Sequence, residues 1–129
     1  MSKREDLSAL STLNLSGCVP SCKLEDLNPA FVEKLLFAQK YAGFQFTITS
    51  AYRSQAYECS KGRKGSSSHC KGLAVDISSR DSHTRFKVVM ACHLAGICRS
   101  GIGETFVHVD DDETKAHPIM FTYYSPQET

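Results

Sequence analysis

The sequence contains no tryptophan, no long apolar segment and little net charge. No apolar run approaches the ~20 residues of a membrane-spanning helix, so we expect no membrane partner. The 15 Lys and Arg residues nearly balance the 14 Asp and Glu residues, and the net charge is +1. This balance gives no electrostatic reason to expect nucleic acid as a partner. Internal repeats and a dividing linker are also absent, and a chain of 129 residues predicts one globular domain.

An export signal is the next missing feature. Residues 1–7 include positive charge, but no apolar core follows them as it would in a secretory signal. We therefore expect a chain that is cytoplasmic as synthesised and that acts elsewhere only after release. Six cysteines are many for such a chain, and without export the expected state is reduced thiols. Cys18 and Cys22 have loose metal-ligand spacing, but no second such pair completes a structural zinc site.

Two segments of different character follow one another along the chain. Residues 1–27 are polar and predict an amino-terminal arm, whereas residues 28–129 carry helix and strand patterns and predict the main domain. Asn28-Pro29 opens a helix that runs to Tyr41 and stops at Gly43. A second helix, capped by Ser82 and running to about residue 95, has four apolar residues on one face: Phe86, Val89, Met90 and Leu94.

Strands are predicted over residues 44–50, 73–77, 101–103, 106–110 and 119–124. The last three of these segments are expected to form two or three antiparallel strands. The order of the elements predicts an α+β fold, a small antiparallel sheet with helices packed on one face.

Asp76 and His108 fit their predicted strands badly. Each places a charged or half-charged group in an apolar strand, which is costly unless the group is paired or bound to a metal. His69 lies seven residues before Asp76, at the mouth of the same strand. Two imidazoles and one carboxylate form a three-ligand set that leaves a fourth zinc position open, as in catalytic zinc sites. The alternative is that Asp76 caps a turn and His108 is a hydrogen-bonded core histidine.

Three motifs in combination carry a resemblance to a known family. They are Ser50-Ala-Tyr-Arg53-Ser54, then Ser67-x-His69-x-x-Gly72-x-Ala74-x-Asp76-Ile77, and finally Phe106-Val-His108-Val-Asp110. Over residues 28–124 the chain resembles the M15 zinc D-Ala-D-Ala peptidases, whose fold is shared with the hedgehog signalling domain. The resemblance implies a zinc metallopeptidase with Zn²⁺ on His69, Asp76 and His108. An HExxH motif is absent, so thermolysin-like enzymes are not the comparison.

The resemblance also implies roles beyond metal binding. It matches Ser67 to a serine that binds the substrate backbone, and Arg53 to an arginine that contacts substrate and polarises the carbonyl or holds a carboxylate. The family's usual base position, three residues before the last histidine, is Thr105 here, which cannot serve. We expect Asp110 to be the base, because strand alternation puts it on the face of His108, ~6.6 Å along the strand. Glu104 is the second candidate, and it requires a bend at Gly103.

The implied substrate is a peptidoglycan stem peptide, cleaved by a D,D-carboxypeptidase or an endopeptidase such as a phage or prophage lysis enzyme. We expect a monomer. The competing interpretation is a non-catalytic zinc-containing binding module, because the hedgehog domain keeps this zinc site without working as a peptidase. A third interpretation, a nucleic-acid loop over residues 61–71, lacks interleaved aromatic residues and a basic overall balance.

Overall fold

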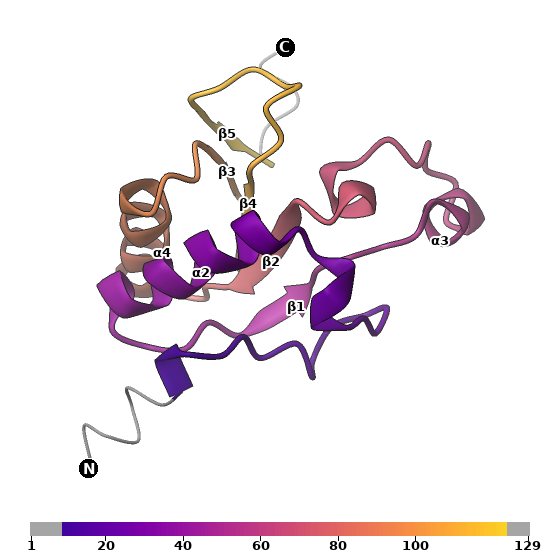
Figure 1. Cartoon of the computed structure of the whole chain (residues 1–129). Helices are drawn as coiled ribbons and strands as arrows, with labels where there is room; N and C mark the ends of the chain where they lie inside the picture. Colours follow the sequence, from indigo (N-terminus) through magenta and orange to yellow (C-terminus); the bar gives the residue numbers. More distant parts are fainter. Residues whose placement is uncertain (1–8, 124–129) are drawn as a thin grey trace.

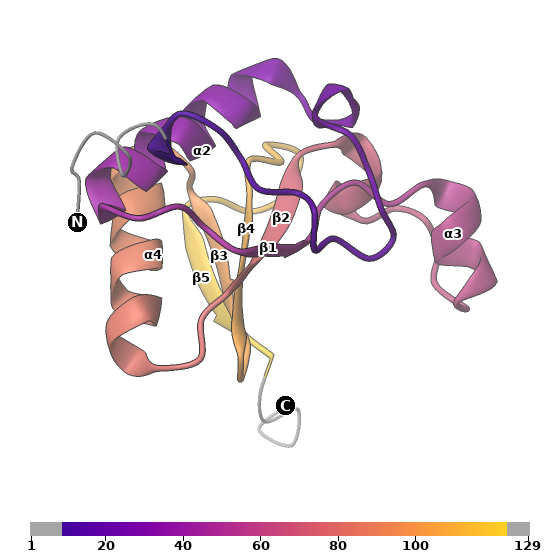
Figure 2. The same cartoon turned by 90° about the horizontal axis from the view of Figure 1, so that it is seen from below.

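The computed structural model describes residues 9–123 (Figure 1). Two helices, α2 (Pro29–Ala42) and α4 (Ser82–Leu94), lie side by side and cover one face of a five-stranded sheet (Figure 2). The sequence signals at α2 act as predicted. The Asn28 side chain accepts hydrogen bonds from the backbone N–H groups of Ala30 and Phe31, and Gly43 ends the helix with φ 85°. The α+β architecture predicted from the sequence is confirmed.

The sheet has the strand order β1-β2-β4-β3-β5. Its strands are β1 (Ile48–Ser50), β2 (Ala74–Ser78), β3 (Arg99–Ile102), β4 (Phe106–Asp110) and β5 (Ile119–Thr122). All neighbours are antiparallel except β3 and β5, which are parallel, so the expectation of antiparallel pairing was wrong for the last strand. Residues 111–118 carry the chain from the end of β4 past β3 to the outer edge, which gives β5 the direction of β3.

Side-chain alternation divides β2 and β4 between two faces. Val75, Ile77, Val107 and Val109 are fully buried and pack against the helices in the hydrophobic core. The intervening residues face the other way, and the register places Asp76 directly opposite His108. The sheet therefore buries one apolar face and presents the polar residues of its central strands on the other.

The second helix was predicted correctly in position but not in orientation. Its cap is Asp81, whose side chain accepts from the backbone N–H of Thr84, rather than Ser82. Phe86 and Leu94 are 65% and 62% exposed, and Met90 is exposed too. The buried residues are smaller ones, Val88, Val89, Ala91 and Cys92. Close packing of α4 against α2 and the sheet selects this stripe of small side chains over the stripe of large ones.

Residues 9–27 pack onto the main body. Leu10, Cys18 and Leu27 are buried, and the fully buried Gln39 amide donates hydrogen bonds to the carbonyl groups of Leu10 and Thr12. A short 3-10 helix, η1 (Leu24–Asp26), precedes α2. The domain boundary predicted at residue 27 stays a prediction, and the first eight residues of that arm lie outside the described part.

The connection from β1 to β2 holds the remaining short elements, α3 (Gln55–Ser60) and η2 (Ser68–Lys71). Helix α3 projects from the body at the end opposite α4 (Figures 1 and 2). The first predicted strand is shorter than expected, beginning at Ile48 instead of Phe44, and position 124 of the last one lies outside the described residues. Among the described helices, none has the length and apolar character needed to cross a bilayer.

Candidate active site

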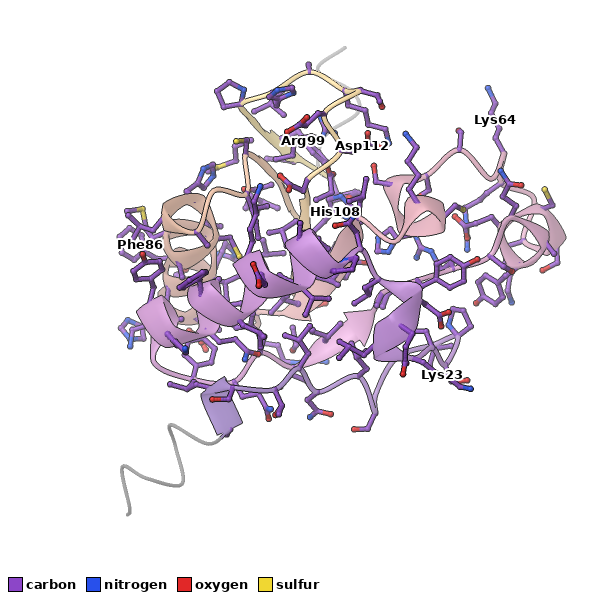
Figure 3. The ribbon with its side chains drawn as sticks, in the orientation of Figure 1. Lys23, Lys64, Phe86, Arg99, His108 and Asp112 are labelled. Atoms are coloured by element: carbon purple, nitrogen blue, oxygen red, sulfur yellow. The ribbon has the colours of Figure 1, made fainter. Side chains whose placement is uncertain are left out.

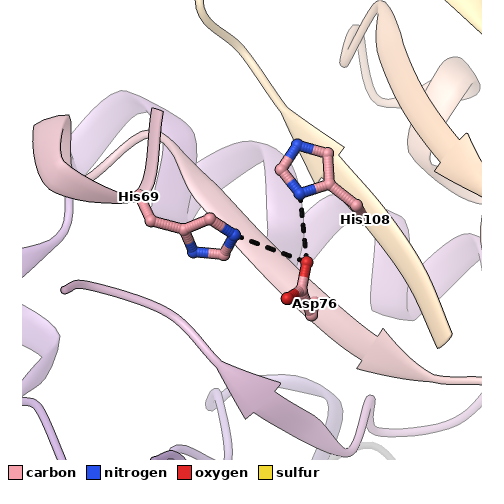
Figure 4. Close-up of side chains that lie close together, drawn as sticks. All are labelled: His69, Asp76 and His108. Atoms are coloured by element: carbon pink, nitrogen blue, oxygen red, sulfur yellow. Dashed lines mark hydrogen bonds and ion pairs between the residues drawn. The ribbon is translucent and has the colours of Figure 1, made fainter. Parts of the chain in front are cut away.

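Three side chains from three separate elements meet on the polar face of the sheet. They are His69 from η2, Asp76 from β2 and His108 from β4. Figure 3 labels His108 on the whole chain, and Figure 4 shows the three side chains together. One potential ligand atom from each residue lies within 4.8 Å of the other two. Asp76 Oδ1 is 3.4 Å from His69 Nε2 and 3.0 Å from His108 Nδ1. The structure thus brings together all three ligands that the sequence motifs predicted.

The η2 turn holds His69 beside the sheet. Ser67 is the N-cap of η2, and its hydroxyl accepts a hydrogen bond from the backbone N–H of His69 at 3.0 Å. Gly72 ends η2 with φ 70°, and a Cβ at this position would lie 2.5 Å from the carbonyl oxygen of Asp26. A residue with a side chain would therefore be strained in conformation and would collide with η1. These two residues fix the step from η2 into β2, and so the spacing between His69 and Asp76.

The His69 ring is oriented by the backbone. Its Nδ1 lies 2.6 Å from the carbonyl oxygen of Ala51, which can only accept, so Nδ1 carries the proton. In the neutral ring, Nε2 then has its lone pair, and this atom faces Asp76. A histidine whose other nitrogen donates to a carbonyl group is the usual arrangement of a metal ligand. His69 is 2% exposed, which restricts the ring to this position.

His108 lies between two carboxylates. Its Nδ1 contacts Asp76, and its Nε2 is 2.7 Å from Asp110 Oδ2. Burial alone would lower the pKa of His108, but the hydrogen bonds with Asp110 and Asp76 outweigh it and raise the pKa. Burial likewise opposes ionisation of Asp76, yet the hydrogen bonds with His108 and His69 hold its pKa well below the usual range. Asp76 therefore stays ionised, as a metal ligand must be.

Asp110 lies where strand alternation predicted, on the face of His108, but it contacts the ring nitrogen turned away from Asp76. Its Oδ2 contacts His108, while its Oδ1 accepts from Arg99 Nε at 2.8 Å and from the backbone N–H of Asp112. Its side chain is 1% exposed. Both oxygens are thus engaged, and this arrangement favours orientation of His108 over proton transfer. The assignment of Asp110 as the base stays a prediction.

Glu104 lies in the turn between β3 and β4, exposed, and it is not among the residues that line the cleft above the three ligands. The structure therefore does not bring the second candidate base to the site. Arg53 and Ser67 do line this cleft. Arg53 is joined to the site by its backbone N–H, which donates to the carbonyl of His69, and by Nη1, which donates to Ser50 Oγ at 3.1 Å.

The cleft has a volume of about 370 Å³ and one aromatic wall. Phe121 and Tyr123 stack near His108, with ring centroids 5.9 and 6.4 Å from it, and Phe106 packs against Tyr123. Partial burial, with Asp76 and Asp110 nearby, raises the pKa of Tyr123 to about 12. The phenol therefore keeps its proton at neutral pH and can act as a hydrogen-bond donor.

Sequence reasoning missed several residues of the site. The aromatic wall, Arg99 and Arg63 were not predicted, although all line the cleft. The aromatic residues at positions 121 and 123 were a signal for the wall, because residues two apart in an extended chain lie on the same face. No local signal identified Arg99, since its position depends on the pairing of β3 with β4, which places it opposite Asp110.

Two histidines and one carboxylate below an open cleft, on an α+β fold, form a group that could hold a metal ion, as in a metal-dependent hydrolase. The chain belongs to the peptidase M15 family, whose model matches residues 3–110. The match contains the three candidate ligands and begins within the predicted amino-terminal arm. Family membership makes the chain a metallopeptidase from a family of zinc enzymes. No curated protein matches the chain, and no solved structure does.

Proposed function

We propose that this protein is a zinc-dependent peptidase that hydrolyses a peptide bond in peptidoglycan stem peptides. The observation that carries the proposal is the convergence of His69, Asp76 and His108 at an open cleft, with the second nitrogen of each ring already hydrogen-bonded. The donor set, two nitrogens and one carboxylate oxygen, suits zinc. The peptidoglycan substrate rests on the motifs that resemble the D-Ala-D-Ala peptidases.

Each residue of the cleft has a distinct role in the proposed hydrolysis. When bound, zinc would supply a Lewis acid that polarises the scissile carbonyl and activates a water molecule. Arg53 holds a carbonyl or carboxylate group of the substrate through its planar set of donors. Asp110 orients His108 and keeps Nδ1 directed at Asp76. Ser67 and the Tyr123 hydroxyl offer further hydrogen bonds to the peptide backbone.

Digestion of purified muropeptides by the zinc-loaded protein tests this function. Mass analysis of the products distinguishes loss of a terminal residue, as by a D,D-carboxypeptidase, from cleavage within the stem or cross-link, as by an endopeptidase. His69→Ala serves as the inactive control because it removes one ligand. If the zinc-loaded wild-type protein leaves all muropeptides intact, the proposed function is wrong.

A binding module is the second candidate, and one observation favours it. Among the described residues, the only carboxylates that line the cleft are Asp76 and Asp110, and both are engaged by other groups. The binding module predicts that muropeptides bind without being cleaved. We further propose that the protein is a monomer that reaches the cell wall after release, as a lysis enzyme would. Sedimentation of the purified protein tests the first part.

A further inference from the structure

A buried carboxylate holds two arginines at the edge of the cleft. Glu58, on α3, is 1% exposed. Its Oε2 accepts hydrogen bonds from Arg63 Nε at 2.9 Å and Nη2 at 2.6 Å, and it lies 3.4 Å from Arg53 Nε. The hydrogen bond from Arg63 lowers the pKa of Glu58, with the charge of Arg53 contributing. One carboxylate therefore fixes Arg63 by two hydrogen bonds and forms an ion pair with Arg53, and the trio keeps a net positive charge.

The backbone after α3 explains why Arg63 is in this place. Gly62 has φ 79°, and its N–H donates to the carbonyl of Cys59. The N–H of Arg63 donates to the carbonyl of Glu58 at 2.9 Å. These two bonds form a Schellman motif, in which the residue after the glycine lies against the residue three positions before the helix cap. That contact is usually apolar, but here it is the ion pair between Arg63 and Glu58.

Within the described part of the chain, the guanidinium group of Arg63 is hydrogen-bonded on one side only. Its bonds to Glu58 use Nε and Nη2, and Nη1 lies outside them. Its side chain is 49% exposed, against 19% for Arg53, and both line the cleft of the metal ligands. Arg53 is thus the deeper of the two guanidinium groups and Arg63 lies at the rim. A fixed guanidinium with free donors is suited to bind a carboxylate.

The charges of the cleft favour an anionic ligand. Four basic residues line it, Arg53, Arg63, Arg99 and Lys115. Arg99 is engaged by Asp110. Within residues 9–123, the only other carboxylate that lines the cleft is that of Asp76, one of the candidate metal ligands. A divalent ion at those ligands would add further positive charge. The potential of the cleft therefore attracts negative groups, most strongly on the side of Arg53 and Arg63.

We propose that Arg63 is a specificity-determining residue that selects peptides carrying a second carboxylate, beyond the group held by Arg53, at the rim of the cleft. This inference rests on the proposed peptidase function and adds a substrate preference to it. The second carboxylate can be an acidic side chain or a free α-carboxyl group of a branched or isopeptide-linked residue. Both present the same planar group to the guanidinium.

The test compares matched peptides that differ only in this group. Each peptide is made with both carboxylates free, with the side-chain carboxylate amidated, or with the α-carboxylate amidated. For each peptide, the dissociation constant is measured by fluorescence anisotropy and kcat/KM by product mass. The protein variants are wild type, Arg63→Gln, Arg63→Lys and, as control, Lys64→Gln. Lys64 is the adjacent exposed residue, extends into solvent and does not line the cleft (Figure 3).

We expect the wild-type protein to bind the peptide with both carboxylates free about tenfold more tightly than one of the two amidated peptides, because amidation removes a charge-assisted hydrogen bond. Arg63→Gln should reduce this ratio to about twofold or less, and Arg63→Lys should give an intermediate ratio. Lys64→Gln should keep the wild-type ratio. The amide that the wild-type protein binds more weakly, and for which this difference depends on Arg63, identifies which carboxylate Arg63 binds.

If Arg63→Gln keeps the wild-type ratio of dissociation constants, the proposal is wrong. It is also wrong if Lys64→Gln reduces this ratio as much as Arg63→Gln does, because the effect would then come from the general positive charge of the loop. If Arg63→Gln does not fold by circular dichroism, Arg63→Lys supplies the decision, and a wild-type ratio in that variant contradicts a role for the planar fork. Failure of the proposed function has a different signature. It would appear as no hydrolysis of any peptide, while the ratio of dissociation constants would still test Arg63.

Discussion

His108 is the residue on which the site depends, because its two ring nitrogens contact two different carboxylates. Asp76 lies at Nδ1 and Asp110 at Nε2. A neutral imidazole can donate from only one nitrogen, so a proton retained on Nε2 by Asp110 leaves Nδ1 as the ligand atom. The ring of His69 is set in the same way by the carbonyl of Ala51. Each histidine thus has one assigned nitrogen for a metal.

The first prediction concerns zinc content. The purified wild-type protein should hold about one zinc ion per chain, and His69→Ala and Asp76→Ala should hold little, because each removes one of three protein ligands. Elemental analysis after dialysis gives the measurement. His83→Ala is the matched control, since His83 is an exposed histidine at the start of α4. Undiminished zinc in both ligand variants would exclude this site.

The second prediction separates the two roles considered for Asp110. If Asp110 orients His108, Asp110→Asn should weaken zinc binding by about 10- to 100-fold. If it is the base, the variant should keep its zinc affinity and lose turnover by about 10²-fold or more. We expect the first result, because both oxygens of Asp110 are engaged in the structure. Zinc titration followed by rate measurement at saturating zinc decides between them.

Glu104→Gln completes this comparison. Glu104 is exposed and outside the cleft, so its variant should keep the zinc affinity and turnover of the wild type. An inactive Glu104→Gln that retains zinc would show that the turn between β3 and β4 bends toward the metal when substrate binds. In that case Glu104, the second candidate of the sequence analysis, would be the base.

For single residues, the sequence predicted which three candidate ligands meet in the structure, but it predicted little of what surrounds them. His69, Asp76 and His108 stand out because polar groups in apolar strands need a reason. The position of Asp110 followed from the two-residue period of a strand. Arg99 did not follow, because its partner Asp110 is brought near by the pairing of β3 with β4. Only the pairing of Glu58 with Arg63 had a local signal, the glycine that ends α3.

The elements around the site are tied together by Asp112, a buried residue just after β4. Its Oδ2 accepts hydrogen bonds from Ser68 Oγ at 2.7 Å and Lys71 Nζ at 2.9 Å, both on η2. Its Oδ1 accepts from the backbone and side chain of Thr114. Asp112 therefore joins the end of β4, which follows His108, to the turn that carries His69.

The third prediction is that this link is sensitive to acid. Burial opposes ionisation, but hydrogen bonds from Thr114, Ser68 and Lys71 hold the pKa of Asp112 well below its usual range. A carboxyl group whose pKa is lower in the folded state stabilises the protein above its unfolded pKa of ~3.9, and this contribution is lost as the pH falls through the folded value. Asp112→Asn should therefore lower the free energy of unfolding by about 1–3 kcal/mol at neutral pH.

The difference between Asp112→Asn and wild type should shrink as the pH is lowered from about 5 toward about 2, because the wild-type carboxyl group is then increasingly protonated. Urea unfolding at several pH values measures it. Glu113→Gln is the control, since Glu113 is the exposed neighbour. A difference that does not change with pH would mean that the asparagine acts through altered packing and not through the lost charge.

Helix α2 and helix α4 show how far element prediction reaches. The ends of α2 followed from a capping asparagine, a proline at the first position and a final glycine, which are local interactions. The buried face of α4 did not follow, because two apolar stripes compete on this helix. The stripe of small residues is buried because α4 packs closely against α2. How closely the two helices pack is a property of the fold and cannot be read from the α4 sequence alone. The direction of β5 likewise depends on the path of residues 111–118.

Over the whole molecule, burial divides the six thiols into classes. Burial raises the pKa of Cys92 to about 12, and burial together with Cys22 raises the pKa of Cys18 to about 12. Cys59, by contrast, is exposed. Thiolates are the reactive form, so Cys92 and Cys18 should react slowly in the native state.

The fourth prediction follows from these classes. Thiol titration under non-reducing conditions should find close to six free groups after denaturation, and fewer fast-reacting groups in the native protein. Mass analysis of the fast-labelled protein should place label on Cys59 and not on Cys92. Two or fewer free thiols after denaturation would contradict the expected reduced state.

The alternation of β2 and β4 also restricts how this chain can change in evolution or in engineering. Val107 and Val109 enter the core while His108 and Asp110 face the cleft, so inserting or deleting one residue within β4 before His108 would exchange the two sets. The insertion would bury the metal-binding groups and expose the valines, and would thereby damage folding and activity together. Changes of two residues preserve both faces. Libraries for altering substrate preference should therefore keep the length of β4 unchanged, and place length variation in the loop at residues 64–66, after the turn that positions Arg63.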